Sequence, residues 1–90
     1  MLRNANHENN DPQYRQAGEW FRKQRRHCQI TQAELAEQAG LGDTGMIDRI
    51  ERGEIAMPRS MCTAIARVFG VDRISLAGHY KAWYGDKAAA

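Results

Sequence analysis

The sequence has few of the features that build a disulfide-linked or membrane-spanning protein. It contains two cysteines and two prolines among 90 residues. Its apolar runs are only a few residues long, far below the roughly 20 needed to cross a bilayer. Cys28 and Cys62 lie far apart and form no Cys-x-x-Cys pair, so we expect free thiols in a reducing compartment. Residues 1–10 contain no apolar segment that could direct secretion. These absences predict a cytoplasmic protein without a membrane segment.

Length and composition allow one small domain. A 42 % apolar and 27 % charged composition is that of a globular chain. A chain this short buries only about 60–65 % of the surface that its unfolded form exposes, so it has room for one core and no large catalytic architecture. Abundant Ala, Gln, Glu and Arg, with few β-branched residues besides isoleucine, favour helix over sheet. We therefore predict an all-α fold.

Capping signals divide the chain into five helices. The Asn-rich residues 1–10 are predicted to be a flexible arm and residues 85–90 a C-terminal tail, on either side of a domain at 11–84. Helix starts are expected at Asp11-Pro12, at the Thr31 and Glu34 capping box, at Asp43, at Pro58 and at Asp72. Helix ends are expected near His27, Gly40, Gly53 and Gly70.

The second and third predicted helices, joined by a glycine-containing turn, form a candidate helix-turn-helix. Their surroundings resemble the Cro and cI phage-repressor family, also called XRE-type, in the segments Thr31-Gln32-Ala33-Glu34-Leu35-Ala36, Gly40-Leu41, Ile47-Asp48-Arg49-Ile50-Glu51-Arg52-Gly53 and Pro58. The similarity spans about Phe21 to Leu76, and several separate segments agree in spacing. The resemblance implies a five-helix, lambda-repressor-like domain that binds double-stranded DNA.

The resemblance also implies roles for individual positions. The base-reading positions would be Thr44, Gly45, Asp48 and Arg49, the phosphate contacts Gln32, Arg52, Arg59 and Ser60, and the structural salt bridge Arg25 with Glu51. Arg49 has the chemistry to bind guanine through two hydrogen bonds. The turn is one residue longer than the common family pattern, which leaves the register of the recognition helix open by one position.

Several positions have a second interpretation. Gln32 could be a solvated residue at a helix start, and Arg52 a solvated charge. Asp48 could accept a hydrogen bond from cytosine or form a local ion pair. Glu54 occupies a position where the family often has a basic residue, which implies a lighter phosphate footprint. Four basic residues either widen that footprint or form a solvated helix face, namely Arg15, Arg22, Lys23 and Arg26.

The last predicted helix carries an apolar face, formed by Leu76, Tyr80, Trp83 and Tyr84. A domain this small makes few base contacts, and a two-fold homodimer doubles them by binding two half-sites. We therefore predict that these residues form a dimer interface. In the alternative, they close the core of the monomer.

The leading hypothesis is a sequence-specific transcriptional regulator, a dimeric repressor of a palindromic operator. The alternative is a protein-binding helical module such as an antitoxin or anti-activator, because the predicted recognition helix is poor in arginine and carries acids. His7, His27 and His79 have no carboxylate or nucleophile at a useful local spacing, which argues against an enzyme. His27 and Cys28 point in different directions on a helix, so we predict no metal site and no cofactor.

Overall fold

Helices form every regular element in the part of the chain that the structure describes. The structure is a computed structural model that describes residues 12–85. Its elements are α1 (Pro12–His27), α2 (Gln32–Gln38), α3 (Thr44–Glu51), the short 3-10 turn η2 (Arg59–Met61), α4 (Cys62–Phe69) and α5 (Arg73–Tyr84). The predicted all-α fold is confirmed. The predicted arm at 1–10, the Asp11 cap and all of the predicted tail except Gly85 lie outside the described residues.

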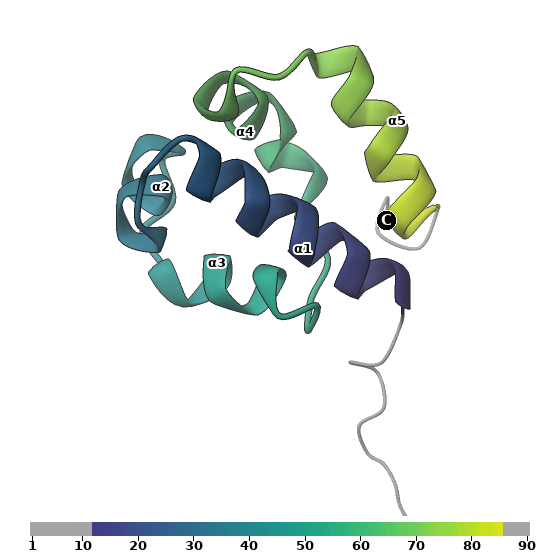
Figure 1. The fold of residues 1–90 in the computed structure, drawn as a ribbon, viewed down its shortest axis with the longest axis horizontal. Coiled ribbons are helices and arrows are strands. Elements are labelled where there is room, and N and C mark those ends of the chain that lie inside the picture. The colour runs from purple at the N-terminus through teal and green to yellow at the C-terminus, as the bar shows by residue number, and fades with distance from the viewer. Residues whose placement is uncertain (1–11, 86–90) are drawn as a thin grey trace, which may run out of the picture.

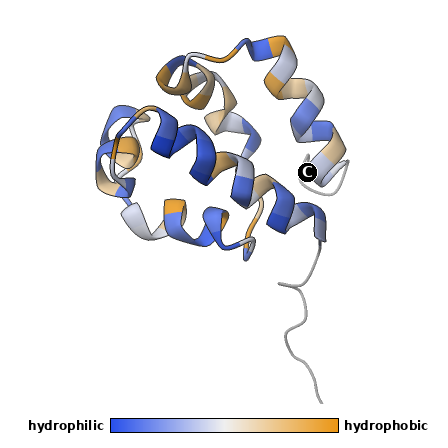
Figure 2. Ribbon diagram, in the orientation of Figure 1, coloured by the Kyte–Doolittle hydropathy of each residue, from blue (hydrophilic) through white to orange (hydrophobic). Residues whose placement is uncertain are grey.

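α1 lies between α3 and α5 and contacts both helices (Figure 1). α2 packs against α3 and α4, and α4 packs against α5. One apolar core lies among the five helices, and its fully buried large side chains are Phe21, Leu35, Ile47, Ile50, Met57, Ile65 and Leu76. Most of α1 is hydrophilic (Figure 2), so it enters this core through a narrow stripe that includes Ala17 and Phe21.

Capping chemistry determines where α2 and α5 begin. The Thr31 hydroxyl accepts from the Glu34 amide at 3.0 Å, and the Glu34 carboxylate accepts from the Thr31 amide at 2.8 Å. Asp72 accepts from the Ser75 amide at 3.0 Å. Each side chain satisfies an amide that has no partner within the helix. Both predicted starts are confirmed.

The predicted start of the fourth helix at Pro58 is wrong. Pro58 has an extended backbone with ψ 138°, and its carbonyl accepts from the Met61 amide at 3.0 Å to form the turn η2. α4 begins only at Cys62. A proline fixes φ but not ψ, so the same residue suits a helix start and an extended segment. As a consequence, Arg59 and Ser60 lie on an exposed 3-10 turn rather than in the first turn of an α-helix.

α1 and α3 cross at Gly18, which is buried. A Cβ atom at this position would lie 2.6 Å from the carbonyl oxygen of Ile50, and closer still to that of Glu51. Real Cβ atoms essentially never approach so closely, so the crossing requires a residue without a side chain. The apolar periodicity of α1 did not identify this position.

The four residues predicted to form a dimer interface lie in the core instead. Leu76, Tyr80, Trp83 and Tyr84 are 1 %, 3 %, 9 % and 3 % exposed. Burial raises the pKa of Tyr84 to about 12. Side chains inside the core of one chain cannot form the contact surface of a second copy. The predicted dimer interface is therefore wrong for these residues, which close the core of the monomer.

Two aromatic side chains of α1 cover this face of α5. The Tyr14 ring stands edge-on to that of Tyr84, with centroids 5.2 Å apart, and the Trp20 ring lies 5.1 Å from that of Trp83. These separations are typical of favourable aromatic pairs. The first and last helices of the described chain thus bury each other's aromatic side chains.

Candidate nucleic-acid interface

The turn between α2 and α3 fixes the register of α3. Gly40 adopts the left-handed conformation with φ +76°, and the Leu41 amide donates to the Ala36 carbonyl at 2.8 Å. Asp43 then has an extended backbone, and its carboxylate accepts from the Gly45 amide at 2.9 Å. α3 therefore begins at Thr44, directly after the cap predicted at Asp43.

α3 has a buried face and an exposed face. Ile47 and Ile50 are 0 % exposed and anchor the helix in the core. Because a helix advances about 100° per residue, residues on either side of this stripe point outward. The predicted base-reading positions all lie on the outward side: Thr44, Gly45 and Arg49 are exposed and Asp48 is half-exposed. The outer face of α3, defined by these four residues, thus faces solvent rather than the core.

The Arg25–Glu51 ion pair implied by the resemblance is present between the ends of α1 and α3. Arg25 donates from Nε and Nη2 to the two oxygens of Glu51, at 2.6 and 3.1 Å. The Glu51 side chain is only 1 % exposed. Hydrogen bonding to Glu51 raises the pKa of the Arg25 guanidinium above its usual range. Two parallel hydrogen bonds fix direction as well as distance, so the pair orients α3 on α1.

Gln32 bridges α2 and α3. Its amide nitrogen Nε2 donates to Asp48 Oδ1 at 3.2 Å and to Glu51 Oε1 at 3.1 Å. An amide nitrogen has two N–H groups, so both are engaged within the chain, and the remaining amide oxygen can only accept. To donate to a phosphate, Gln32 must give up one of these carboxylates. Neither sequence-based interpretation of Gln32 included this bridge.

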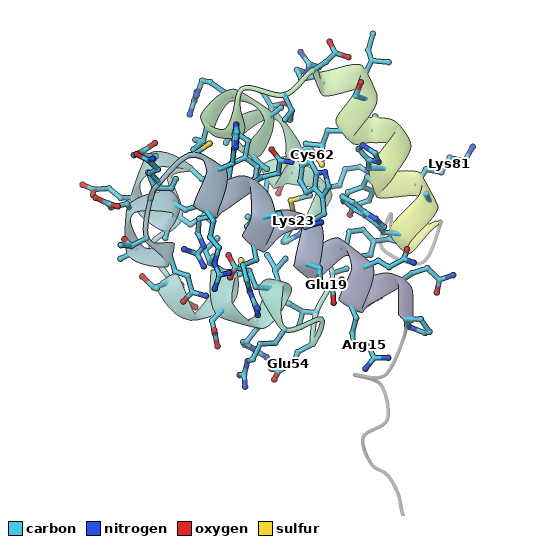
Figure 3. The ribbon with its side chains drawn as sticks, in the orientation of Figure 1. Arg15, Glu19, Lys23, Glu54, Cys62 and Lys81 are labelled. Atoms are coloured by element: carbon cyan, nitrogen blue, oxygen red, sulfur yellow. The ribbon has the colours of Figure 1, made fainter. Side chains whose placement is uncertain are left out.

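Exposed ion pairs extend from the end of α3. Asp48 Oδ2 lies 3.1 Å from Arg52 Nε, so the local ion pair is the interpretation of Asp48 that the structure shows. Glu54, labelled at the end of α3 in Figure 3, lies 3.1 Å from Arg52 Nη2 and 4.0 Å from Arg49 Nε. Exposed pairs contribute only about 0–1 kcal/mol each. A phosphate or a base edge can therefore replace them at small cost.

The other predicted phosphate contacts are distributed around α3. Arg26, Gln32 and Thr44 line a shallow depression between the end of α1, the start of α2 and the start of α3. Arg59 and Ser60 are exposed on η2, beyond the loop that leaves α3. The structure thus brings Gln32 next to the base-reading face and places Arg59 and Ser60 on a separate element.

Residues 12–85 contain no group of three His, Cys, Asp or Glu side chains that could hold a metal ion. None of the helices described is both long and apolar enough to cross a membrane.

Comparison with known families gives one result. The model of a family described as helix-turn-helix domain matches residues 16–77. The matched range begins within α1 and ends within α5, so it includes α2, α3 and the turn between them. Searches of curated proteins and of solved structures gave no match.

Proposed function

Because this chain belongs to the helix-turn-helix domain family, among its XRE/Cro-like domains, we propose that it is a transcriptional regulator that binds double-stranded DNA. α3 would lie in the major groove, with Thr44, Asp48 and Arg49 toward the base edges. The observation that carries the proposal is the outer face of α3, which is exposed while Ile47 and Ile50 hold the helix in the core.

We propose that different residues read the base sequence and position the domain on the DNA backbone. Arg49 is exposed, and within residues 12–85 its side chain pairs only with Glu54, at 4.0 Å, so its guanidinium can bind a guanine edge. Gln32, Arg52, Arg59 and Ser60 would contact phosphates, which fixes orientation without reading sequence. Gly45 contributes no side chain, but it lets the backbone approach the groove closely.

Selection of bound fragments from random double-stranded DNA tests the proposal. We expect a short enriched motif, and an affinity that falls steeply as salt increases because Lys and Arg displace counterions from phosphates. A palindromic motif would support a homodimer acting as a repressor at an operator. A single half-site would support a monomer. Absence of any enrichment at low salt would contradict DNA binding and favour a protein-binding module such as an antitoxin or anti-activator.

Arg49→Ala and Gln32→Ala should weaken binding in different ways. Arg49→Ala is expected to remove about 1–3 kcal/mol of discrimination at one base position. Gln32→Ala should lower the affinity for every DNA sequence by a similar factor, roughly two- to tenfold. It removes a contact that positions the domain on the DNA backbone, and it removes the bridge from α2 to α3. Fluorescence anisotropy on matched and mismatched duplexes measures both effects.

Arg67→Ala provides the matched control for Arg49→Ala. It also removes one exposed arginine, from α4 rather than α3. We expect it to leave base preference unchanged. If Arg67→Ala and Arg49→Ala alter preference equally, the outer face of α3 does not read the sequence.

Glu54→Gln should strengthen DNA binding. The substitution removes a negative charge and releases Arg49 and Arg52 from their ion pairs. We expect roughly a five- to tenfold gain in affinity at low salt, together with a steeper salt dependence, by about 0.9 in slope for each additional phosphate neutralised. Glu19→Gln removes an exposed carboxylate from α1 and should change affinity less (Figure 3). Equal gains in both variants would mean that only net charge matters.

A homodimer remains part of the proposal, although not through the face first predicted. The contact would have to use side chains that the monomer leaves exposed. Among the described residues, Ile74 on α5 is the exposed large hydrophobic side chain, at 82 %. Sedimentation of the free protein and of its DNA complex would determine whether one or two chains bind each site.

A further inference from the structure

A pocket with a basic lining lies between η2, α4 and α5, outside the outer face of α3. It encloses roughly 500 Å³, and its lining includes Arg59, Thr63, Arg73, Ala77, Tyr80 and Lys81. This volume is within the range of about 300–1,000 Å³ that small-molecule sites occupy. We call it the cationic pocket.

The charges around the cationic pocket are of one sign. Arg59, Arg73 and Lys81 come from two separate elements, and no acidic residue of the described chain lines the pocket. Within residues 12–85, none of the three forms an ion pair with an acid, unlike Arg49 and Arg52. Like charges around a concave surface raise the local concentration of anions.

The inner part of the pocket is preorganised. The Arg59 guanidinium lies over the Tyr80 ring, 5.5 Å from its centroid, at a distance typical of a cation–π contact. The Tyr80 hydroxyl in turn donates to the Met57 carbonyl at 2.8 Å. Tyr80 is therefore held at both its ring and its hydroxyl, and it positions Arg59.

The spacing of residues along α5 forms the outer part of the pocket. Arg73, Ala77 and Lys81 recur every four residues and so share one face of the helix. Ala77 leaves space between the two longer side chains. Lys81 extends outward from α5, away from Cys62 (Figure 3), so it forms the rim of the pocket rather than its floor. The Thr63 hydroxyl adds a hydrogen-bonding group from α4.

We propose that the cationic pocket binds a small phosphorylated molecule, with its phosphate among Arg59, Arg73 and Lys81 and its organic part against Cys62, Ala77 and Tyr80. A phosphate monoester carries nearly two negative charges at neutral pH and has three acceptor oxygens. It can therefore engage several cations at once, and the planar guanidinium of arginine matches it with paired hydrogen bonds. A carboxylate has one charge and two oxygens, so it matches this lining less well.

Occupation of the cationic pocket would affect DNA binding through Arg59. The same guanidinium is a proposed contact to a DNA phosphate, and it cannot serve both anions together. The phosphorylated ligand is therefore expected to compete with DNA. This regulatory consequence depends on the proposed DNA-binding function, whereas binding of the ligand to the free protein does not.

Titration of the DNA-free full chain with phenyl phosphate tests the pocket, with calorimetry or backbone NMR shifts as the measurement. We expect saturable binding at one site, tighter than binding of inorganic phosphate because the ring packs on the apolar wall. Arg73→Gln should lower the affinity about tenfold, by removing one charge-assisted contact. Lys23→Gln removes the same charge from an exposed position on α1 and should change affinity less than twofold (Figure 3).

Two outcomes of this titration would overturn the proposal. Absence of saturable binding would exclude a phosphate site. An equal loss of affinity in Arg73→Gln and Lys23→Gln would mean that the ligand responds to overall charge rather than to the pocket.

A DNA titration without ligand separates a small phosphorylated molecule from the DNA backbone as the source of the phosphate. Arg73→Gln should leave the affinity for DNA within about twofold, because Arg73, unlike Arg59, is not among the proposed DNA contacts. If the substitution weakens DNA binding by the same factor as phenyl phosphate binding, the pocket holds a backbone phosphate, and the proposal is wrong. Failure of DNA binding by the unmodified protein would instead contradict the proposed function and leave the phenyl phosphate result standing.

Discussion

Gly18→Ala should destabilise the domain by about 2–3 kcal/mol or more, the upper range for overpacking a closely packed site. The new Cβ would lie 2.6 Å from the Ile50 carbonyl oxygen and would also overlap that of Glu51. Both atoms belong to the backbone of α3, so a side-chain rotation cannot relieve the contact. α3 would have to move away from α1, which should weaken DNA binding as well.

Gly78→Ala is the matched control, because Gly78 also lies within a helix but is exposed. A Cβ atom there meets nothing within 4 Å. Alanine favours helix over glycine by about 1 kcal/mol, so Gly78→Ala should stabilise the domain by roughly 0.5–1 kcal/mol. Urea unfolding followed by circular dichroism gives both changes. If both substitutions stabilise the domain, the gain in helix propensity at Gly18 exceeds the cost of overlap with α3. The backbones of α1 and α3 would then lie farther apart than in this structure.

Arg25→Leu is the second substitution with a large expected effect. It leaves the Glu51 carboxylate, 1 % exposed, without its paired guanidinium. Removal of one partner of a buried ion pair costs about 3–5 kcal/mol, because the other charge remains out of water. For a domain of this size, we expect the Tm to fall by more than about 12 °C.

Two further variants test whether the loss of stability comes from breaking the buried ion pair or from removing a positive charge. Arg22 Nε also lies 3.8 Å from Glu51, but its side chain is 45 % exposed, so Arg22→Leu should cost less than about 1 kcal/mol. The double variant Arg25→Leu, Glu51→Leu removes both buried charges and should be more stable than Arg25→Leu alone. If the double variant loses as much stability as the sum of the losses in Arg25→Leu and in Glu51→Leu alone, Arg25 and Glu51 are not coupled.

Helix starts could be predicted from the sequence where the capping group lies within three residues of the amide that it satisfies. Thr31 with Glu34, Asp43 and Asp72 are such cases. Pro58 was misassigned because its fixed φ is compatible with two values of ψ, and the following 3-10 turn selects the extended one. The outward face of α3 was also predictable once Asp43 set the register, because 100° per residue then places Gly45, Asp48 and Arg49 away from Ile47 and Ile50, with Thr44 at the side.

Partners far along the chain could not be predicted in the same way. The period of α5 identified an apolar face but not what covers it, and Tyr14 and Trp20 of α1 cover it in place of a second copy. The bridge from Gln32 to Asp48 and Glu51, and the position of Glu54 beside Arg49 and Arg52, depend on how α2 and the loop after α3 approach α3. The requirement for glycine at position 18 is visible only in the crossing of α1 and α3.

The sequence by itself determined the helical class and the helix starts at Thr31, Asp43 and Asp72, because caps and periodicity act through neighbours within a few residues. The candidate base-reading positions came instead from the resemblance to the Cro and cI family. Only the tertiary structure decided which apolar face is buried within the monomer, which carboxylates hold Gln32 and the arginines of α3, and that Arg59, Arg73 and Lys81 share one pocket. Such contacts depend on the packing of helices that are distant in the chain, and side-chain type alone does not encode that packing.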